Sequence, residues 1–473
     1  MIRNVSMLVL LLGMVVRAGA ADFPWYVEHS IPQGEGRQTG EPFAPKARCV
    51  IEVTNPHDFD VSRAGVVVRR DQLPVTNLYE DWITPVDPNE PGQVSPPTSV
   101  IWEQGTVLKG REENGHYLVY QADDLDKDGL WDELFFQVDM KAGETKPIVL
   151  YFGANERGLF KHEVHAEIGS YGKHLIPWWE SESMGWKLWF IDSVDMNGKT
   201  KPALKAYEED AENISGHVSP KDYGNDILWV SDTFGAGGIG VVEDPANPEK
   251  VARPRFSDEN TSVVGQRFIG TNIGRGPIFD SRAAYDVVVN GPLRSTVRIY
   301  TTNWGSTQGR YEAVQDYTAY AKKNYTTCSV KFTKFIHADN DVAMAVGMRQ
   351  IMNEKTSRHT DSLAVSEATD LDIWDINETL PAGKKHLIDW EGIAIAVKNN
   401  LDSNYHKMAA QSGNHLLYFP VPRDKSFDYI MLAGWSRGYQ VNDSKKFNKY
   451  VTENVAVFNK PMQVKVGPLE MKQ

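Results

Sequence analysis

Aromatic and ionisable residues are concentrated in one part of the sequence, between residues 171 and 240. His174 is followed by the adjacent pair Trp178 and Trp179, and charged residues continue from there to Asp226. A buried charge must be paired, so strands this rich in charge either lie at the surface or line a cleft. Tryptophan beside acids and histidine favours a cleft, because the indole offers a flat apolar face with a polar edge.

Such a cleft could carry out β-elimination on a uronic acid. The reaction needs a cation to neutralise the carboxylate, a base to take the C5 proton and an acid to protonate the departing 4-oxygen. We expect His174 or His217 as the base and Tyr223 as the acid. Arg275 or Arg282 would hold the carboxylate, because arginine presents a planar fork of donors. The predicted substrate-binding set is completed by Trp179, Glu182, Lys199 and Asp226.

Two other functions stay open for the same residues. A glycoside hydrolase would need two carboxylates across the scissile bond, and this region offers Glu180, Glu182, Asp192 and Asp195. A non-catalytic carbohydrate-binding protein would instead use Trp178, Trp179 and Trp189 as a stacking platform. Most of the 12 histidines are expected simply to pack at the surface or against strands.

The charge balance narrows the range of partners. A formal net charge of −13 argues against nucleic acid or an acidic membrane surface. The stretch from Arg253 to Arg298 is nevertheless rich in arginine, which suits an acidic ligand. We therefore expect an acidic oligosaccharide as the partner, with scattered surface arginine as the structural alternative.

A second group of carboxylates lies in the run from Asp124 to Asp132. Acidic residues at alternate positions around Gly129 suit Ca²⁺, which takes oxygen ligands in a sharply turned loop. Phe135 stands where a helix-loop-helix calcium site would have its last ligand, and it cannot coordinate a metal. The sequence therefore predicts a variant of the calcium loop that is flanked by strands and has a structural role. The alternative is an acidic turn capped by its own side chains. The predicted metal ligands are Asp124, Asp126, Asp128 and Asp132. The run Gly235–Gly240 lacks the Lys-Ser/Thr of a phosphate loop, and we expect no organic cofactor.

The first residues predict export. Arg3, an apolar run at Met7–Val16 and the small residues Ala18-Gly19-Ala20 form the pattern of a signal peptide over residues 1–20. The apolar run is about half the ~20 residues that span a bilayer, so no membrane insertion is expected. The periplasm is the expected destination, with secretion as the alternative.

The elements that must position these residues are predicted to be strands. Short β-branched and aromatic runs bounded by turn residues indicate an all-β chain. We expect a small β-sandwich over residues 40–155 and a large β-super-sandwich over residues 162–473 that carries the site. Helices are expected only at Thr200–Ala211 and Ser444–Phe458. An excursion rather than a strand is expected where prolines cluster, at Pro85, Pro88, Pro91, Pro96 and Pro97.

The two cysteines, Cys49 and Cys328, are expected in different domains. Two buried thiols or one interdomain disulfide are both compatible with this spacing.

The block Trp179-Glu180-Ser181-Glu182 with Trp186-Lys187 resembles the acidic-aromatic signature of an uncharacterised family of exported bacterial proteins. That family is encoded among polysaccharide-degrading enzymes, with which this chain would then work. Further matches follow in the family's order, at Asp195-Met196-Asn197-Gly198-Lys199, His217, Asp226, Gly235–Gly238 and Gly291-Pro292.

This resemblance implies a galactose-mutarotase-like super-sandwich and an activity on oligosaccharides. The nearest known reaction is the dehydration that forms an unsaturated uronic acid at the non-reducing end in ulvan breakdown. Two departures put the transfer of individual residues in doubt: Ser181-Glu182 stands where Asn-Asp is expected, and Ala236 stands where the family has Cys.

Overall fold

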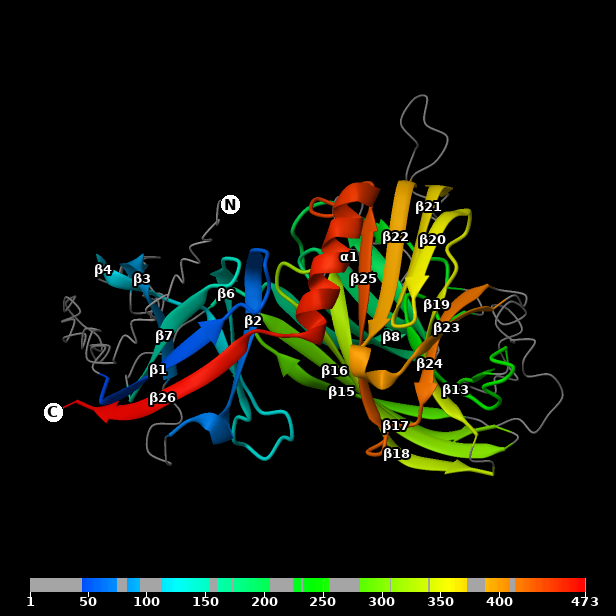
Figure 1. Ribbon diagram of the computed structural model, residues 1–473, viewed down its shortest axis with the longest axis horizontal. Helices are drawn as coiled ribbons and strands as arrows, with labels where there is room; N and C mark the ends of the chain where they lie inside the picture. Colours follow the sequence, from blue (N-terminus) through cyan, green and yellow to red (C-terminus); the bar gives the residue numbers. More distant parts are fainter. Residues whose placement is uncertain are drawn as a thin grey trace, which may run out of the picture.

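A computed structural model of the chain consists of two β-sandwiches that lie side by side (Figure 1). It describes residues 45–74, 83–93, 112–153, 160–171, 174–189, 191–204, 224–230, 233–249, 251–254, 281–306, 308–338, 341–371, 388–408 and 413–472. All the paired strands run antiparallel, and the all-β class predicted from the sequence is confirmed. Among the described residues, no helix has the length and apolarity needed to cross a bilayer.

The small sandwich packs a five-stranded sheet on a three-stranded sheet. The first has the order β26 (Gln463–Met471), β1 (Ala47–Thr54), β7 (Thr145–Phe152), β3 (Ile83–Gln93), β4 (Glu112–Tyr117), and the second β2 (Val61–Arg69), β6 (Glu133–Met140), β5 (Tyr120–Asp123). Apolar residues alternate along these strands, as expected when one face of a sheet is buried. Cys49, Ile51 and Val53 of β1 thereby meet Val66 and Phe136 in one core.

The last strand of the chain belongs to the first sandwich. β26 pairs with β1 from Ala47 opposite Met471 to Thr54 opposite Gln463. The expected division at residue 162 assigned this strand to the large sandwich. Short strands with alternating Val464 and Val466 carry no local mark of their partner, so a sequence pattern cannot tell which sheet they join.

The proline-rich segment also differs from expectation, because β3 runs through it. Pro85 pairs with Leu150 of β7, and its carbonyl accepts from the amide of Leu118. A register shift between Asp87 and Pro91 interrupts the pairing with β4. Proline lacks one backbone N–H donor. A strand can therefore contain proline where a register shift means that this donor is not needed for pairing. Pro96 and Pro97 lie outside the described residues.

The large sandwich packs two sheets against a third. Two five-stranded sheets lie in one layer. The first has the order β12 (Gly224–Asp226), β11 (Ser193–Lys199), β10 (Met184–Trp189), β9 (His174–Ser181), β8 (Val164–Tyr171). The second has the order β14 (Val251–Ala252), β13 (Gly238–Val242), β19 (Ala343–Arg349), β24 (Asn414–Pro420), β23 (Asn404–Met408). A parallel bridge between Val194 and Gly235 links these two sheets into one layer.

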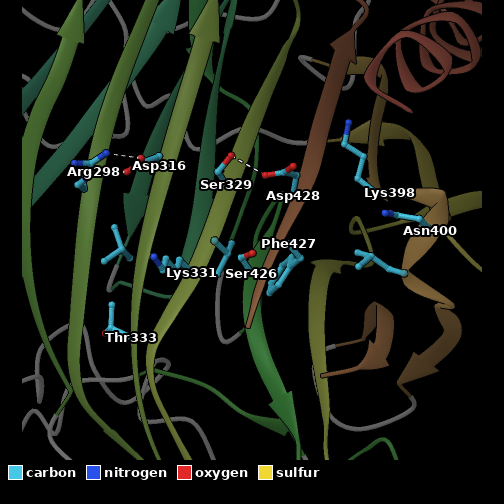
Figure 2. Close-up of a pocket in the computed structure, with 13 residues that line it drawn as sticks. Arg298, Asp316, Ser329, Lys331, Thr333, Lys398, Asn400, Ser426, Phe427 and Asp428 are labelled. Carbon is cyan, nitrogen blue, oxygen red and sulfur yellow. Dashed lines mark hydrogen bonds and ion pairs between the residues drawn. The ribbon is translucent and has the colours of Figure 1, made fainter. Parts of the chain in front are cut away.

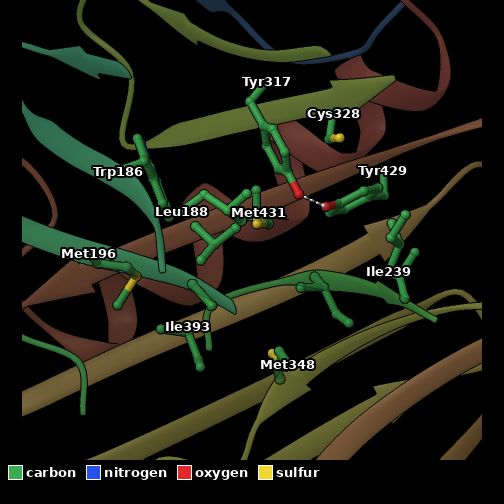
Figure 3. Packing of buried hydrophobic residues seen from close by; sticks show 14 of the residues in the cluster. Trp186, Leu188, Met196, Ile239, Tyr317, Cys328, Met348, Ile393, Tyr429 and Met431 are labelled. Atoms are coloured by element: carbon green, nitrogen blue, oxygen red, sulfur yellow. Dashed lines mark hydrogen bonds between the residues drawn. The ribbon is translucent and has the colours of Figure 1, made fainter. Parts of the chain in front are cut away.

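The opposite layer is an eight-stranded sheet, with the order β15 (Arg282–Asn290), β16 (Arg294–Gly305), β17 (Gly309–Tyr320), β18 (Tyr325–His337), β25 (Ser426–Trp435), β22 (Ile388–Val397), β21 (Leu363–Leu371), β20 (Glu354–Thr360). Side chains from both layers meet in a single large core (Figure 3). In it the hydroxyl of Tyr429 donates to that of Tyr317 over 3.0 Å, so even the polar atoms of these rings are satisfied inside.

One of the two expected helices is confirmed. α1 (Ser444–Asn459) begins after Asp443, whose carboxylate accepts from the amide of Lys446 at 2.8 Å and so caps the free N–H groups of the first turn. Phe447 and Val451, four positions apart, bury one face of α1 on the outer side of β22 and β25. Residues 200–204 are not helical, and the rest of Thr200–Ala211 lies outside the described residues.

A buried arginine joins the two sandwiches. Arg294 of β16 forms ion pairs with Asp123 and, at 2.8 Å, with Glu133, both from the small sandwich, and stacks on the ring of Phe135. Cys49 and Cys328 lie in the cores of different sandwiches as free thiols, which excludes a disulfide between them in this structure. Burial raises the pKa of Cys49 to about 12, so this thiol is unreactive.

Candidate active site

The two faces of the sheet β8–β12 differ completely in chemistry. Because strand neighbours alternate between faces, Trp179, Trp186 and Met196 all point into the core, where Trp179 donates to Thr326 Oγ1 at 2.8 Å. The other face is called the charged face below, and its side chains are almost all buried. It carries His165 and Glu167, Trp178 and Glu180, Lys187, Asp195, Asn197 and Lys199, and Asp226.

Lys187 is at the centre of the charged face. Its side chain is fully buried, with Nζ 3.0 Å from Asp195 and 3.1 Å from Asp226, and 5.3 Å from the ring centroid of Trp178. Burial lowers the pKa of Lys187, but the charges of the two aspartates outweigh it and raise the pKa overall. Lys187 is therefore a permanent cation that holds two carboxylates beside an indole ring.

Two residues from other sheets extend this group. Arg349 ends β19 and Glu391 lies in β22, and both interact electrostatically with Asp195. Burial lowers the pKa of Arg349 to about 10, against the opposing charges of Glu391 and Asp195. Burial likewise raises the pKa of Glu391 well above its usual value, and Asp226 adds to this rise. Burial therefore favours the protonated form of Glu391.

Arg349 and Glu391 also have unused hydrogen-bonding capacity. Nη1 of Arg349, both carboxyl oxygens of Glu391 and Oδ1 of Asn197 are buried, and no group in the described ranges hydrogen-bonds to them. Buried polar atoms are normally paired, so each such atom calls for an explanation. Arg349 therefore has a donor, and Glu391 and Asn197 have oxygens, that could bond to a polar ligand.

A second charged group occupies the other end of the charged face. Glu180 lies 3.2 Å from Nδ1 of His165 and forms an ion pair with Lys199. Nε2 of His165 is 3.4 Å from Glu167. Burial by itself would raise the pKa of Glu180, but Lys199 and His165 lower it overall. Lys199 also donates to the carbonyls of Ser181 and Ala203, at 2.6 and 2.7 Å, and this fixes it in place.

The residues expected from the sequence are only partly brought together. Asp226 and Lys199 lie on the charged face, whereas Trp179 points into the core and cannot stack on a sugar. Glu182 lies in the turn after β9, paired with Lys322 at 2.7 Å. Arg282 is exposed on β15, in the opposite layer.

One of the two predicted bases lies within the described residues. His174 begins β9, where its backbone pairs with Tyr171. His217, Tyr223 and Arg275 lie outside the described residues. The segment 205–223, which contains His217 and Tyr223, connects β11 to β12 of the same sheet.

Sequence reasoning missed His165, Arg349 and Glu391 as site residues. His165 is isolated in a mixed stretch, so no pattern singles it out. Arg349 and Glu391 each flank an apolar strand, where a charge normally marks the exposed end of the strand. Only the packing of the layers brings them to Asp195.

The acidic loop has the geometry of a cation site formed by three of its four predicted ligands. Carboxylate oxygens of Asp124, Asp126 and Asp128 lie within 4.8 Å of one another. Oδ1 of Asp124 is buried and accepts no hydrogen bond from the described residues, which fits a Ca²⁺ ligand. Asp132 instead accepts from the amide of Leu125 at 2.7 Å, so it organises the backbone of the loop. Gly129, with φ +91°, makes the turn.

Two open pockets within the described parts of the chain lie away from the charged face. One, of about 550 Å³, lies on the outer side of the eight-stranded sheet (Figure 2). The other, of about 540 Å³, is bordered by Phe335, His337 and Tyr418. Neither is lined by Lys187, Arg349 or Glu391, and all three of these side chains are buried.

A family model described as a domain of unknown function (DUF4861) matches residues 101–464. The chain belongs to this family, which confirms the resemblance to an uncharacterised family. The matched range begins after β3 and ends in β26, so it includes the large sandwich and part of the small one.

Two solved structures are similar in arrangement. An alpha-mannosidase from Enterococcus faecalis V583 gives a TM-score of 0.42 at 12% identity, covering 90% of this chain and 46% of that chain. A protein in glycosyl hydrolase family 38 from Enterococcus faecalis gives 0.44 at 11% identity, covering 89% and 47%. This chain thus spans somewhat under half the length of each. A search of curated proteins finds no match.

Proposed function

We propose that the protein is an exported, carbohydrate-active enzyme that acts on oligosaccharides containing uronic acid, with its active site over the charged face. The observation that carries the proposal is the pair Arg349 and Glu391. A buried arginine with a free donor can receive a carboxylate, and a neutral buried acid can donate a proton. Trp178 is 6% exposed and lies against Lys187, so its ring helps to hold this cation in place.

The proposed reaction is β-elimination of water. A base removes the proton at C5, the electron pair of that C–H bond forms the C4=C5 double bond, and the C4–O bond breaks towards oxygen. The acid protonates the departing oxygen, which leaves as water when it is the free 4-hydroxyl of a terminal uronate. The product is a 4,5-unsaturated uronic acid at the non-reducing end.

Two residues next to the charged face would fill two of the three roles. Arg349 would neutralise the carboxylate of the uronate, which makes the C5 proton acidic enough to remove. Glu391 would protonate the 4-oxygen, and its raised pKa keeps it protonated for this step. The base is proposed to be His174 or His217, as expected from the sequence, and the segment with His217 begins and ends in strands of this sheet.

A panel of uronate oligosaccharides tests the proposal. Incubation should remove one water from the substrate mass and create new ultraviolet absorption from the conjugated double bond. Glu391→Gln should lower the rate by ~100-fold or more, since general acids contribute this much. Glu367→Gln is the matched control, because Glu367 is a buried carboxylate of the neighbouring strand that accepts from Trp390 and Asn448. Equal losses in both variants would remove Glu391 from the mechanism.

A glycoside hydrolase is the second candidate, because Glu391 and Asp226 are two interacting carboxyl groups of which one is held protonated. The product decides between them. Hydrolysis adds one water and gives no double bond, whereas binding without any change in mass would leave a non-catalytic carbohydrate-binding protein.

A further inference from the structure

We propose that the pocket on the outer side of the eight-stranded sheet is a second, non-catalytic site that binds an acidic saccharide. We call it the outer pocket, and its polar lining is provided by Arg298, Asp316, Ser329, Lys331, Asn400 and Asp428. The choice of a saccharide as ligand rests on the proposed function. The existence of the site rests on the geometry below.

One wall of the outer pocket is a row of polar side chains across four strands. Arg298, Asp316, Ser329 and Asp428 lie opposite one another in register on β16, β17, β18 and β25. Figure 2 shows the two contacts that fix this row: Arg298 pairs with Asp316 through two bonds of 2.8 Å, and Ser329 donates to Asp428 at 2.7 Å. Paired side chains of this kind keep one orientation, so acceptors for sugar hydroxyls are already in place.

The opposite wall comes from the segment after β22. Lys398 and Asn400 face the row across the pocket (Figure 2). Lys398 is held by a hydrogen bond to the carbonyl of Phe458 and lies 4.0 Å from the centroid of its ring, so the end of α1 supports this wall. Leu401 and Phe427 supply apolar lining. The volume of about 550 Å³ is within the usual range for small-ligand sites.

Lys331 gives the pocket its preference for an acid. It lies on β18, two residues after Ser329, and pairs with Val314 of β17 on one side and Ser426 of β25 on the other. Its side chain is exposed. It makes no hydrogen bond or salt bridge with any residue of the described chain, and its charge acts on the exposed carboxylate of Asp424. Arg298 is already occupied by Asp316, so Lys331 is the cation that can meet a uronate carboxylate, while the aspartates accept from hydroxyl groups.

The outer pocket and Glu391 lie on opposite sides of the eight-stranded sheet. Asp316 and Lys331 point away from the core, which is filled on the other side of these strands by Tyr317 and Val330. Glu391, Ile393 and Ile395 are alternate residues of β22, and the two isoleucines belong to the core, so Glu391 lies on the inner side of the same sheet. A saccharide unit in the outer pocket therefore cannot also reach Glu391, and the pocket would hold another part of a polymer or another molecule.

Calorimetric titration with a short uronate oligosaccharide tests the inference. Lys331→Met should lose one binding site relative to the native protein, or weaken it roughly ten-fold, the size of one charged hydrogen bond. Lys355→Met, on the far strand β20, removes an equally exposed lysine and should leave the titration unchanged. Carboxyl-reduced oligosaccharide should bind native protein and Lys331→Met equally.

Turnover is measured on the same samples and keeps the two proposals separate. Equal site numbers and affinities in native protein and Lys331→Met would overturn the outer pocket, even if the enzyme is active. A site lost only in Lys331→Met would support the pocket even if no substrate turns over, and the enzymatic proposal alone would then fail.

Discussion

Replacing Lys187 with methionine tests the central feature of the charged face. Methionine has a similar length but no charge, so the variant leaves Asp195 and Asp226 without the ammonium group that lies 3.0 and 3.1 Å from them. Removing one partner from a buried ion pair costs about 3–5 kcal/mol. The side chain of Lys187 is 0% exposed, so solvent cannot replace the lost charge, and we expect a loss at this scale in the free energy of unfolding.

The loss should depend on pH in a defined direction. In the native protein the pKa of Lys187 is raised in the folded state, so its contribution is complete below the unfolded value of about 10.5 and is lost as pH rises through the folded pKa. In the variant, two neighbouring carboxylates repel each other and hold protons more tightly. Lowering the pH neutralises them, so the deficit should shrink between pH 7 and pH 5.

Urea unfolding followed by tryptophan fluorescence measures both quantities. Lys334→Met is the control, because Lys334 pairs with Glu312 at the surface and such pairs contribute about 0–1 kcal/mol. A deficit for Lys187→Met no larger than that of the control at pH 7 would refute the reasoning. So would a large deficit that stays constant down to pH 5.

Three further outcomes follow from the structure. Because folding raises the pKa of Glu391, the free energy of unfolding should fall as pH rises above about 4.5. Glu391→Gln should remove this pH dependence and raise the free energy of unfolding by more than about 1 kcal/mol at pH 8. Parallel curves of stability against pH for the two proteins would contradict this. Calcium should raise the midpoint of thermal unfolding, by the equivalent of about 2.7 kcal/mol at a hundredfold excess over Kd. Asp126→Asn should abolish this rise. Identical midpoints with calcium and with chelator would exclude the site. Trp179→Phe should lower the free energy of unfolding by about 1–3 kcal/mol without affecting saccharide binding. Trp178→Phe should instead weaken saccharide binding. The reverse pattern would show that the two faces of the sheet are misassigned.

The sequence predicts the strands well because they follow local rules. Apolar runs such as Ile393–Val397 form strands of the core, and Asp443 before α1 is a visible helix start. The charges of the stretch between residues 171 and 240 had to be paired or exposed, and the structure pairs Lys187 with Asp195 and Asp226. Alternation alone would have separated Trp178 from Trp179, because neighbours on a strand face opposite sides.

Long-range packing accounts for what could not be predicted. Glu391 and Arg349 come from β22 and β19, more than 100 residues after Lys187, and no local pattern marks an approach between layers. The return of β26 to β1 and the passage of β3 through its prolines depend on partners that the local sequence does not specify. For the same reason a charge that ends an apolar strand cannot be classified as buried or exposed until the layers are assembled.

The pairing of β26 with β1 has a consequence for how the protein is made. During synthesis, β1 emerges long before its neighbour on one side exists, and domains usually fold in the order in which they leave the ribosome. Here the first domain stays open along that edge until the second has been translated, and an unpaired strand edge invites aggregation. A chaperone that shields β1 until the full chain is released should therefore improve the yield of folded protein. The same should hold for any delay in the collapse of β1, and both should help more than slower translation.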